Sequence, residues 1–585
     1  MKVSDYIVSY LEQQGVKCVF EMSGGMIAHL LDSLHQREGI RTVSMRHEQA
    51  AAFAAEAMGR MTGVPGVAMA TSGPGATNLL TGIGSCYFDS SPAVFITGQV
   101  NRNEQKGDRA IRQLGFQETD IVPMALPITK AAWRVREPED VPSMLENAFA
   151  LATDKRPGPV LLDIPMDVQR AEIEIVDAGK AERDVANQAP QPRSQVGVAA
   201  EPQIDQEAWQ SLLRQLEKAK RPLILVGGGV SSSRTVDFFR TFVRKLRVPV
   251  VNSLMAVDVL PFDDQLRVGM IGSYGNRWAN LAIGRADLLL VLGSRLDVRQ
   301  TGSQTEAFKG ERAIFHVDCE SGEINNRVTD CTAIVSGLRE FLAAALTSIE
   351  SLEFAERAEW REEIASLRRL WSDTRELSDV TGINPNVLMH KLSAVSRHAA
   401  AYVVDVGQHQ MWAAQSLELG PTQRFLTSGG MGSMGFSLPA AIGASFAVPS
   451  QPIVLIAGDG GFQSNIQELQ TVSHHRLPLK MVILNNGCHG MVRQFQESYF
   501  ESRYQSTLLG YSAPDFAKVA EAYEIPARTI EDENKTAEAL RWLWSDPTAP
   551  ALLQVMIDTY ANAYPKIAFG SPMTEMEPLT KDTRR

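Results

Sequence analysis

One stretch of the chain, residues 452–491, holds two polar side chains at a spacing that suits metal and phosphate chemistry. Asp459 follows the apolar run 453–457, and Asn486 follows a second, mostly apolar run, 479–484. The runs read as buried strands of one strand–helix–strand crossover, which brings both strand ends to the same edge of a parallel sheet. We therefore expect Asp459 and Asn486 to meet in space. Their carboxylate and amide oxygens suit Mg²⁺ or Ca²⁺ rather than Zn²⁺.

The residues around Asp459 add a phosphate function to this metal site. Three glycines give close backbone access and free N–H groups for a phosphate: Gly458, Gly460 and Gly461. The apolar positions that follow recur at helical spacing and predict one helix: Phe462, Ile466, Leu469 and Val472. The alternative is that Asp459 only caps this helix and Asn486 only forms a turn. Because each of them ends an apolar run, a metal–diphosphate site is favoured.

Composition limits what kind of protein presents such a site. The chain has 585 residues, of which 44% are hydrophobic and 21% charged, enough for roughly three or four domains. Its formal net charge of −11 argues against nonspecific binding to DNA or anionic membranes. The five cysteines lie far apart, which suggests neither a zinc ribbon nor a disulfide framework. We see no signal peptide and no membrane-spanning stretch, and expect a cytoplasmic protein.

The elements that must position the site follow an α/β pattern, in which strand-like runs alternate with helical segments. The ranges 1–175, 206–345 and 383–565 each read as a doubly wound α/β domain. Residues 176–205 are rich in Ala, Gln and Pro and read as an interdomain linker. Residues 346–382 are charged and helical and read as a second linker, and 566–585 read as a C-terminal tail.

The GDG at 458–460, followed two dozen residues later by the NN at 485–486, resembles the signature of thiamine diphosphate enzymes. Further segments make the chain similar to the catalytic subunit of acetohydroxyacid synthase (acetolactate synthase). They are RHEQAA at 46–51, TSGPGATN at 71–78, GFQE at 115–118, RPGPV at 156–160, VGQHQMWAAQ at 406–415 and SGGMGSMGFSLPAAIGA at 428–444. The resemblance covers all three domains. It implies the fold of these enzymes, with a pyrimidine-binding domain first, a central domain second and a diphosphate-binding domain third.

The resemblance also implies roles for individual residues. Mg²⁺ would be bound by Asp459, Asn486 and the backbone carbonyl of Cys488. Thiamine diphosphate would be bound by Gln408, His409, Gly432, Met434, Gly458, Gly460, Gly461, Asn486 and Met491. The catalytic residues would be Glu48, Gln117 and Met434. Glu48 would share a proton with N1′ of the aminopyrimidine, and Met434 would be the apolar wedge that holds the cofactor bent. Cofactors of this class act as electron sinks.

The central domain resembles the FAD-holding domain of the same family. The residues implied are Gly227, Gly228, Gly229, Leu254, Met255, Gly272, Gly293, Arg295, Asp297, Arg299 and Asp318. Two segments depart from the family pattern. The family's GDV-like segment reads VSGL at 335–338, and its GxRxDDR pattern keeps only the acid at Asp297. The alternative is a dinucleotide fold without flavin.

The substrate end departs furthest from the family. The residues implied to line it are Gly25, Phe116, Met491 and Phe495, and Phe495 replaces the family's usual tryptophan. Met166 stands where a lysine is common, the family's GYPGG reads EMSGG at 21–25, and the loop 101–114 is longer than usual. Arg102 or Arg112 in that loop is a candidate contact for an acceptor carboxylate. A changed pocket is worth about 1–3 kcal/mol of discrimination, so the acceptor stays open.

We therefore expect a thiamine diphosphate- and Mg²⁺-dependent enzyme that makes 2-acetolactate from pyruvate, or 2-aceto-2-hydroxybutyrate with 2-ketobutyrate as acceptor. The resemblance implies a homodimer or homotetramer with active sites between subunits, and a small regulatory subunit as a further partner. Alternatives within the resemblance are transfer of the two-carbon unit to a ketone, such as a keto sugar, and simple decarboxylation of a 2-ketoacid. Two further classes are a noncatalytic nucleotide-binding scaffold and an NAD-dependent oxidoreductase. The second lacks a GxGxxG with a downstream acid.

Overall fold

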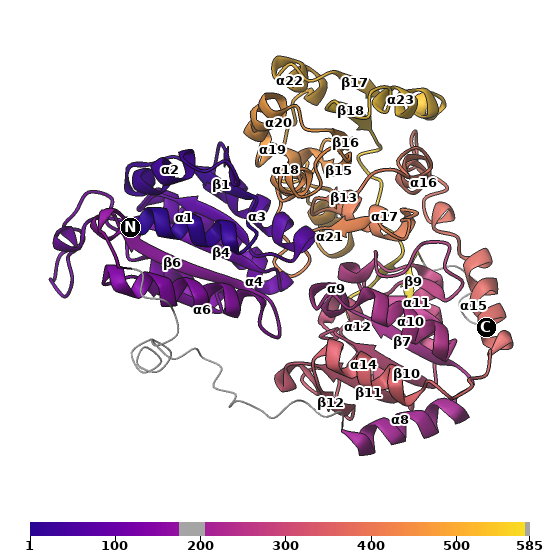
Figure 1. Ribbon diagram of the computed structural model, residues 1–585. Helices are drawn as coiled ribbons and strands as arrows, with labels where there is room; N and C mark the ends of the chain where they lie inside the picture. The colour runs from indigo at the N-terminus through magenta and orange to yellow at the C-terminus, as the bar shows by residue number, and fades with distance from the viewer. Residues whose placement is uncertain (175–204, 579–585) are drawn as a thin grey trace. The chain divides into compact units, whose positions relative to one another are not determined.

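The computed structural model describes residues 1–174 and 205–578, which form three parallel six-stranded sheets flanked by helices (Figure 1). The predicted α/β class with three doubly wound sheets is confirmed. The described residues group into two compact units: unit 1 with 1–174, 428–450 and 465–477, and unit 2 with 205–427, 451–464 and 478–578. None of the described helices is long and apolar enough to cross a membrane.

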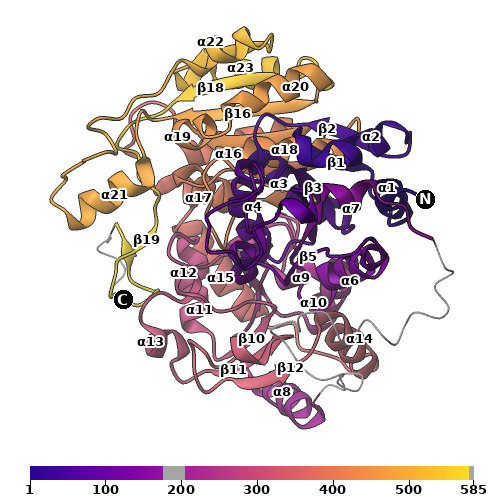
Figure 2. The ribbon, with the colours of Figure 1, turned by 90° about the vertical axis from the view of Figure 1, so that its left-hand side faces the viewer.

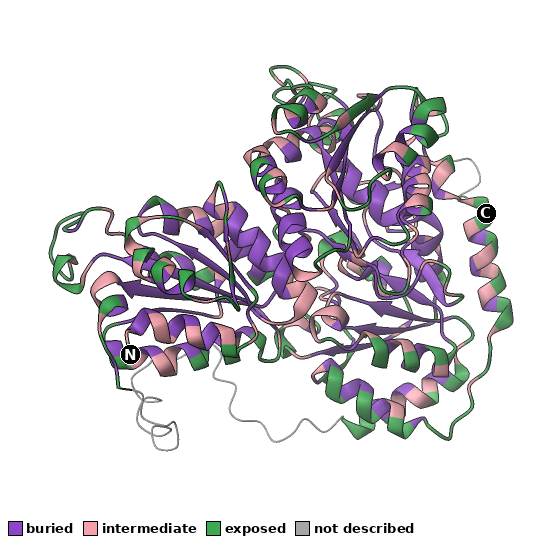
Figure 3. Cartoon of the chain, turned by 45° about the horizontal axis from the view of Figure 1, so that its top comes forward, coloured by how far each residue is buried: buried purple, intermediate pink, exposed green. Residues whose placement is uncertain are grey.

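Unit 1 is built on a sheet with the strand order β2-β1-β3-β4-β6-β5. Its strands are β1 (Cys18–Met22), β2 (Arg41–Ser44), β3 (Gly66–Ala70), β4 (Ala93–Gln99), β5 (Ala131–Arg134) and β6 (Pro159–Pro165). Its helices are α1 (Val3–Gln13), α2 (Ala28–His35), α3 (Glu48–Thr62), α4 (Pro74–Asp89), α5 (Ile121–Ala125), α6 (Val141–Thr153), α7 (Met166–Arg170), α18 (Ser437–Ala447) and α20 (Leu469–His475). Every residue of β3, β4 and β6 is buried, as parallel strands covered on both faces require (Figure 3).

Small residues let α3 lie unusually close to its neighbours. α18 packs along α3, and Figure 2 shows the two helices side by side. A Cβ on Gly443 of α18 would lie 2.1 Å from the Ala54 carbonyl oxygen of α3. A Cβ on Gly82 of α4 would lie 2.3 Å from the Cβ of Ala52. The alanine-rich sequence of α3 therefore serves close backbone packing, and this packing fixes the position of Glu48, the first residue of α3.

Unit 2 contains the other two parallel sheets, with strand orders β12-β11-β10-β7-β8-β9 and β14-β13-β15-β16-β18-β17. The strands of the first are β7 (Pro222–Val226), β8 (Val250–Asn252), β9 (Arg267–Met270), β10 (Leu288–Leu292), β11 (Ala313–Asp318) and β12 (Thr332–Val335). Its helices are α8 (Gln206–Lys218), α9 (Gly229–Ser232), α10 (Val236–Leu246), α11 (Arg277–Arg285), α12 (Val298–Thr301), α13 (Thr305–Lys309) and α14 (Leu338–Ser348).

The remaining sheet of unit 2 carries the stretch with which the sequence analysis began. Its strands are β13 (Ala401–Val404), β14 (Arg424–Leu426), β15 (Ile453–Gly458), β16 (Leu479–Asn485), β17 (Ala527–Ile530) and β18 (Ala551–Met556). The helices of this part are α15 (Ala358–Leu370), α16 (Pro385–Val395), α17 (Gln408–Ser416), α19 (Asp459–Gln463), α21 (Gly490–Tyr499), α22 (Phe516–Ala522) and α23 (Thr536–Leu543). β15 and β16 pair in parallel, with Gly458 opposite Leu484, so both expected strands are present.

The single helix predicted after Asp459 is wrong, because the segment is divided into three. α19 ends at Gln463, a 3-10 turn covers Ile466–Glu468, and α20 follows. Asn465 leaves the helical region with φ −133°, and its side chain donates to the Gly435 carbonyl at 2.8 Å. This tertiary hydrogen bond holds Asn465 at the break between α19 and the 3-10 turn.

The predicted tail is also corrected for the part that the structure describes. Two short antiparallel strands form there, β19 (Lys566–Ile567) and β20 (Met576–Glu577). Met573 and Met576 are buried in the core of unit 2, so this segment is packed rather than loose. Residues 579–585 of the expected tail, and the expected linker 176–205 apart from Asp205, lie outside the described residues.

Candidate active site

The candidate metal site lies at the carboxyl ends of β15 and β16. Asp459 is the first residue after β15, and Asn486 is the first after β16. Both side chains are almost fully buried. Gly487 follows with φ +64°, a left-handed conformation that suits glycine and turns the chain toward Cys488. The structure therefore brings together the three groups that the sequence analysis assigned to Mg²⁺.

A chain of hydrogen bonds anchored on the backbone fixes the orientation of the Asn486 amide. The amide of Gln494 is set by Ala563, whose N–H donates to Gln494 Oε1 at 2.9 Å and whose carbonyl accepts from Gln494 Nε2 at 3.0 Å. Gln494 Oε1 also accepts from Gln408 Nε2 at 3.1 Å, so Gln408 Oε1 faces Asn486 Nδ2, at 3.3 Å. The Asn486 oxygen must then point toward Asp459.

In this orientation three oxygen atoms converge without a hydrogen between them. Asn486 Oδ1 lies 3.2 Å from Asp459 Oδ1 and 2.9 Å from the Cys488 carbonyl oxygen. Rotating the Asn486 amide by 180° would relieve these oxygen–oxygen contacts. It would also break the chain of hydrogen bonds that runs from Ala563 through Gln494 and Gln408 to Asn486. Oxygens bound to adjacent positions of an octahedral Mg²⁺ are about 2.9 Å apart, because each Mg–O bond is about 2.0–2.1 Å long. The residues present therefore fit a magnesium ion.

The electrostatics of this edge point the same way. Burial raises the pKa of Asp459 to about 6, although the Tyr511 hydroxyl donates to its Oδ2 at 2.9 Å. A buried carboxylate is costly without a cation, and Mg²⁺ would supply one. Burial also raises the pKa of the Cys488 thiol to about 11, so this residue offers its carbonyl rather than a thiolate. Tyr511 was not predicted, since no local pattern connects it to a strand end 52 residues earlier.

The groups assigned to the diphosphate gather beside the metal site. Gln408 and His409 open α17, and His409 Nε2 accepts from the Gly458 N–H at 3.2 Å. Burial lowers the pKa of His409 to about 4, so the ring is neutral. Gly460 and Gly461 occupy the first turn of α19, where N–H groups lack intrahelical acceptors. The site thus offers neutral donors beside a metal, a donor set that suits a diphosphate.

The residues assigned to the pyrimidine end lie in unit 1. Glu48 is buried, and its Oε2 accepts from Asn78 Nδ2 at 2.9 Å. A Cβ on Gly75 would lie 3.4 Å from Glu48 Oε1, so the first turn of α4 lies close to this carboxylate. Gln117, with φ +64°, lies against Gly73, the residue that precedes α4. Asn78 is a residue that the sequence analysis did not single out, although it ends the TSGPGATN segment.

Gly432 and Met434, also in unit 1, lie in the loop that leads into α18. Gly432 has φ +69°, and Met434 is partly exposed. The Asp89 carboxylate accepts from the Gly429 N–H at 3.0 Å and from the Gly430 N–H at 2.6 Å, which ties this loop to the end of α4. The loop is thereby held at both ends.

The candidate substrate residues are divided between the units. Unit 1 carries Gly25, at the start of a 3-10 turn (Gly25–Ile27), and Phe116, which is 79% exposed. Unit 2 carries Met491 and Phe495 on α21, and the Phe495 ring contacts the ring of Tyr499 with centroids 4.8 Å apart.

The two arginines proposed for an acceptor carboxylate differ in their surroundings. Arg102 forms salt bridges with Asp167, at 2.8 Å, and with Glu137. These bridges hold the start of the loop 101–114 against the rest of unit 1 and occupy the Arg102 guanidinium. Arg112 is exposed, so it is the better placed of the two to meet a substrate.

The segments assigned to FAD meet at the carboxyl edge of the first sheet of unit 2, where open α/β sheets bind ligands. Gly227, Gly228 and Gly229 follow β7, Leu254 and Met255 follow β8, Gly272 follows β9, Gly293, Arg295, Asp297 and Arg299 follow β10, and Asp318 ends β11. Asp297 caps α12, accepting from the Arg299 N–H at 2.8 Å. His316 Nε2 contacts the Ser294 carbonyl at 2.8 Å, while its Nδ1 is buried and has no hydrogen-bond partner among the described residues. This orphaned nitrogen is compatible with a ligand at the edge.

Comparison with known proteins gives one consistent result. The chain matches three sequence families, described as the N-terminal TPP binding domain (residues 1–124), the central domain (209–345) and the C-terminal TPP binding domain (405–555) of thiamine pyrophosphate enzymes. It is 35% identical to the acetolactate synthase large subunit of Lactococcus lactis, over 98% of this chain and 95% of that one. It is 38% identical to the protein of that name from Parasynechococcus marenigrum, over 97% and 90%. It is 36% identical to the acetolactate synthase isozyme 1 large subunit of Escherichia coli, over 98% and 97%.

Proposed function

Since the chain belongs to the thiamine pyrophosphate enzymes, and among them to the acetolactate synthase large subunits, we propose that it decarboxylates pyruvate and joins the two-carbon unit to a second 2-ketoacid. The observation that carries this proposal is the convergence of three oxygens from Asp459, Asn486 and Cys488. Such an arrangement suits Mg²⁺ and a diphosphate, and a noncatalytic scaffold would have no use for it. The product would be 2-acetolactate, or 2-aceto-2-hydroxybutyrate with 2-ketobutyrate as acceptor.

Some of the protein's residues would bind Mg²⁺ and the diphosphate, and others would take part in proton transfer. When bound, the thiamine group supplies a carbanion and an electron sink. Asp459, Asn486 and the Cys488 carbonyl would hold Mg²⁺, and Gln408 keeps the Asn486 oxygen turned toward the ion. His409, Gly458, Gly460 and Gly461 would surround the diphosphate with neutral groups, so that its charge is met chiefly by the metal.

Glu48 would share a proton with N1′ of the aminopyrimidine and so favour its imino form. Asn78 donates to Glu48 Oε2 at 2.9 Å, which orients the carboxylate. Gly432 would accept from the 4′-amino group through its carbonyl, and Met434 would hold the cofactor bent. Gln117 would lie near the reacting carbon.

The acceptor would be selected by Gly25, Phe116, Met491 and Phe495, with Arg112 as a contact for its carboxylate. The tryptophan usual in the family favours 2-ketobutyrate as acceptor, so its replacement by Phe495 removes that preference and makes pyruvate the expected acceptor. The space that the smaller ring leaves would also admit a larger ketone. FAD would bind at the carboxyl edge of the first sheet of unit 2. Because relatives are named large subunits, we include a small regulatory subunit among the partners, together with a homodimer or homotetramer.

The test is product identification with purified protein, thiamine diphosphate, Mg²⁺ and pyruvate, with and without 2-ketobutyrate or a ketone. We expect acetolactate from pyruvate alone. Product only with a ketone acceptor would replace the proposal by transfer to a ketone, and acetaldehyde alone would replace it by simple decarboxylation. Glu48→Gln should lower turnover by about 10²–10⁴-fold while the protein still binds the cofactor. Glu146→Gln, on the exposed side of α6, serves as the matched control.

A further inference from the structure

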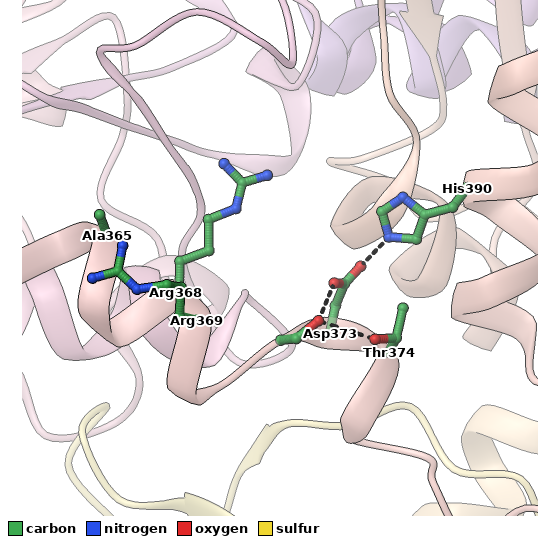
Figure 4. Close-up of a pocket in the computed structure, with 7 residues that line it drawn as sticks. Ala365, Arg368, Arg369, Asp373, Thr374 and His390 are labelled. Carbon is green, nitrogen blue, oxygen red and sulfur yellow. Dashed lines mark hydrogen bonds and ion pairs between the residues drawn. The ribbon is translucent and has the colours of Figure 1, made fainter.

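A cavity of about 580 Å³ lies in unit 2, between the end of α15 and the middle of α16. It is lined by Ala365, Arg368, Arg369, Ser372, Asp373, Thr374 and His390. Figure 4 shows the α15 arginines on one side of this space and His390 of α16 on the other. Its volume is within the range of small-molecule sites. None of the roles assigned above to thiamine diphosphate, Mg²⁺, FAD or substrate uses these residues.

Arg368, which lines the cavity, shares one aromatic ring with Arg267, which is not among the lining residues. The guanidinium carbon of Arg368 lies 4.9 Å from the centre of the Phe262 ring, and that of Arg267 lies 5.1 Å from the same centre. Arg267 is only 7% exposed. Within the described part of the chain, neither group forms a hydrogen bond or a salt bridge with an acid. Each guanidinium group therefore makes a cation–π contact with the Phe262 ring, while its N–H donors remain available to a ligand.

Asp373, the acid that lines the cavity, is already engaged. Asp373 Oδ2 lies 2.8 Å from His390 Nε2 and accepts from the Ser416 hydroxyl at 2.5 Å. The other nitrogen of His390 lies 2.8 Å from Glu418 Oε1. Asp373 attracts Arg267 only at a distance, without contact.

The remaining arginine of the cavity, Arg369, is turned to Glu362 and forms a salt bridge with it. With His390 protonated, its charge and that of Arg369 are offset by three acids: Asp373, Glu418 and Glu362. One positive charge from the Arg267–Arg368 pair is then in excess. Burying an unpaired guanidinium is unfavourable, and Arg368 carries part of this excess charge to the cavity wall, so the cavity favours an anionic ligand.

We propose that this cavity binds a small organic oxyanion, a carboxylate or a phosphate, whose charged group is held by Arg368. Arginine donors match the planar oxygens of both groups and can bind them in a bidentate fashion. Ser372 and Thr374 add hydroxyls to the lining. The size of the cavity leaves room for an organic body beyond the charged group.

The test measures saturable anion binding to the protein loaded with thiamine diphosphate and Mg²⁺, so that the diphosphate site is occupied. The probes are inorganic phosphate and benzoate, titrated by calorimetry and by thermal unfolding against sodium chloride of equal ionic strength. We expect at least one probe to bind saturably and raise the unfolding temperature. The phosphate and benzoate arms tell which oxyanion the site prefers.

Variants locate the binding. Arg368→Met keeps an unbranched apolar side chain against Phe262 but removes the charge, and should weaken probe binding at least tenfold. Arg368→Lys keeps the charge without the planar fork and should give an intermediate loss. Arg369→Met is the matched control from the same helix and should bind as the wild type does, since its charge is already paired.

Two results would overturn the proposal. One is the absence of saturable binding of either probe to the wild-type protein. The other is unchanged binding by Arg368→Met. If Arg368 serves only to brace Phe262, then Arg368→Met should unfold at a lower temperature in chloride alone and bind the probes as the wild type does. Our proposal expects the reverse, an unfolding temperature in chloride that is unchanged or higher, with probe binding lost.

Discussion

The close contact between α18 and α3 allows a sharp prediction for Gly443→Ala. The new Cβ would lie 2.1, 2.7 and 2.8 Å from the carbonyl oxygen, carbonyl carbon and Cα of Ala54, whereas ordinary contact begins at 3.4 Å. The helices must separate by about 1.3 Å, and since every obstructing atom is backbone, no side chain can move aside. Overpacking of this kind costs about 1–3 kcal/mol, and we expect the upper end. That lowers the unfolding temperature by roughly 6–12 °C for a unit of this size.

The same substitution should reduce turnover, because Glu48 begins the helix that is displaced. A misplacement of about 1 Å costs on the order of 10²-fold in rate. Mn²⁺, used as a probe for Mg²⁺, should still bind normally, since Asp459, Asn486 and Cys488 lie in unit 2. Gly322→Ala is the control, because a Cβ there meets nothing within 4 Å. Wild-type unfolding temperature and turnover in Gly443→Ala would refute the reasoning.

Three more substitutions test other parts of the structure. Asp459→Asn should weaken Mn²⁺ binding by about 100-fold, as measured by electron paramagnetic resonance. Because burial raises the pKa of Asp459 to about 6, the affinity of the wild-type protein for Mn²⁺ should also fall about tenfold per pH unit below pH 6 and stay constant above pH 7. Arg277→Leu should cost about 3–5 kcal/mol in denaturant unfolding, since it strands the buried Glu376, and adding Glu376→Leu should recover most of that loss. Burial opposes the charge of His390, but its two carboxylate partners raise its pKa, so the stability lost in His390→Gln should be full below pH 6.5 and shrink as pH rises through the raised pKa. A pH-independent loss would contradict the last of these.

Much of the fold could be read from the sequence, because apolar runs of strand length were followed by glycines or polar turns. β15 and β16 came close to their expected bounds, and with them the meeting of Asp459 and Asn486. Such predictions succeed where local pattern and tertiary environment agree, as in fully buried parallel strands.

The two incorrect predictions, the single helix after Asp459 and the C-terminal tail, have one physical cause. In both segments, contacts with residues distant in the sequence determine the local structure. The apolar positions after Asp459 keep helical spacing through the break, so nothing local announces that Asn465 will bond to Gly435 instead. The segment 566–585 was expected to be a tail because of its charge and proline content. Met573 and Met576 of this segment are nevertheless buried, and their burial depends on residues far away in the sequence.

The candidate site shows the same division. Asp459 and Asn486 could be predicted because strand topology brings them together, and Glu48 because of its motif. Tyr511 could not, and neither could the convergence of Arg267 and Arg368 on one ring, since neither periodicity nor spacing encodes a side-chain contact across about 100 residues.

Helix α17 connects the candidate metal site to the cavity between α15 and α16. Its first residue, Gln408, contacts Asn486 at 3.3 Å, and its last, Ser416, donates to Asp373, which lines the cavity. Nine helical residues span about 13 Å and move as a rigid rod. An anion that repels Asp373 and separates it from Ser416 would therefore act on the same helix that orients the Asn486 oxygen. By thermodynamic linkage, any such effect on the affinity for Mg²⁺ must be matched by an equal effect of Mg²⁺ on the affinity for the anion.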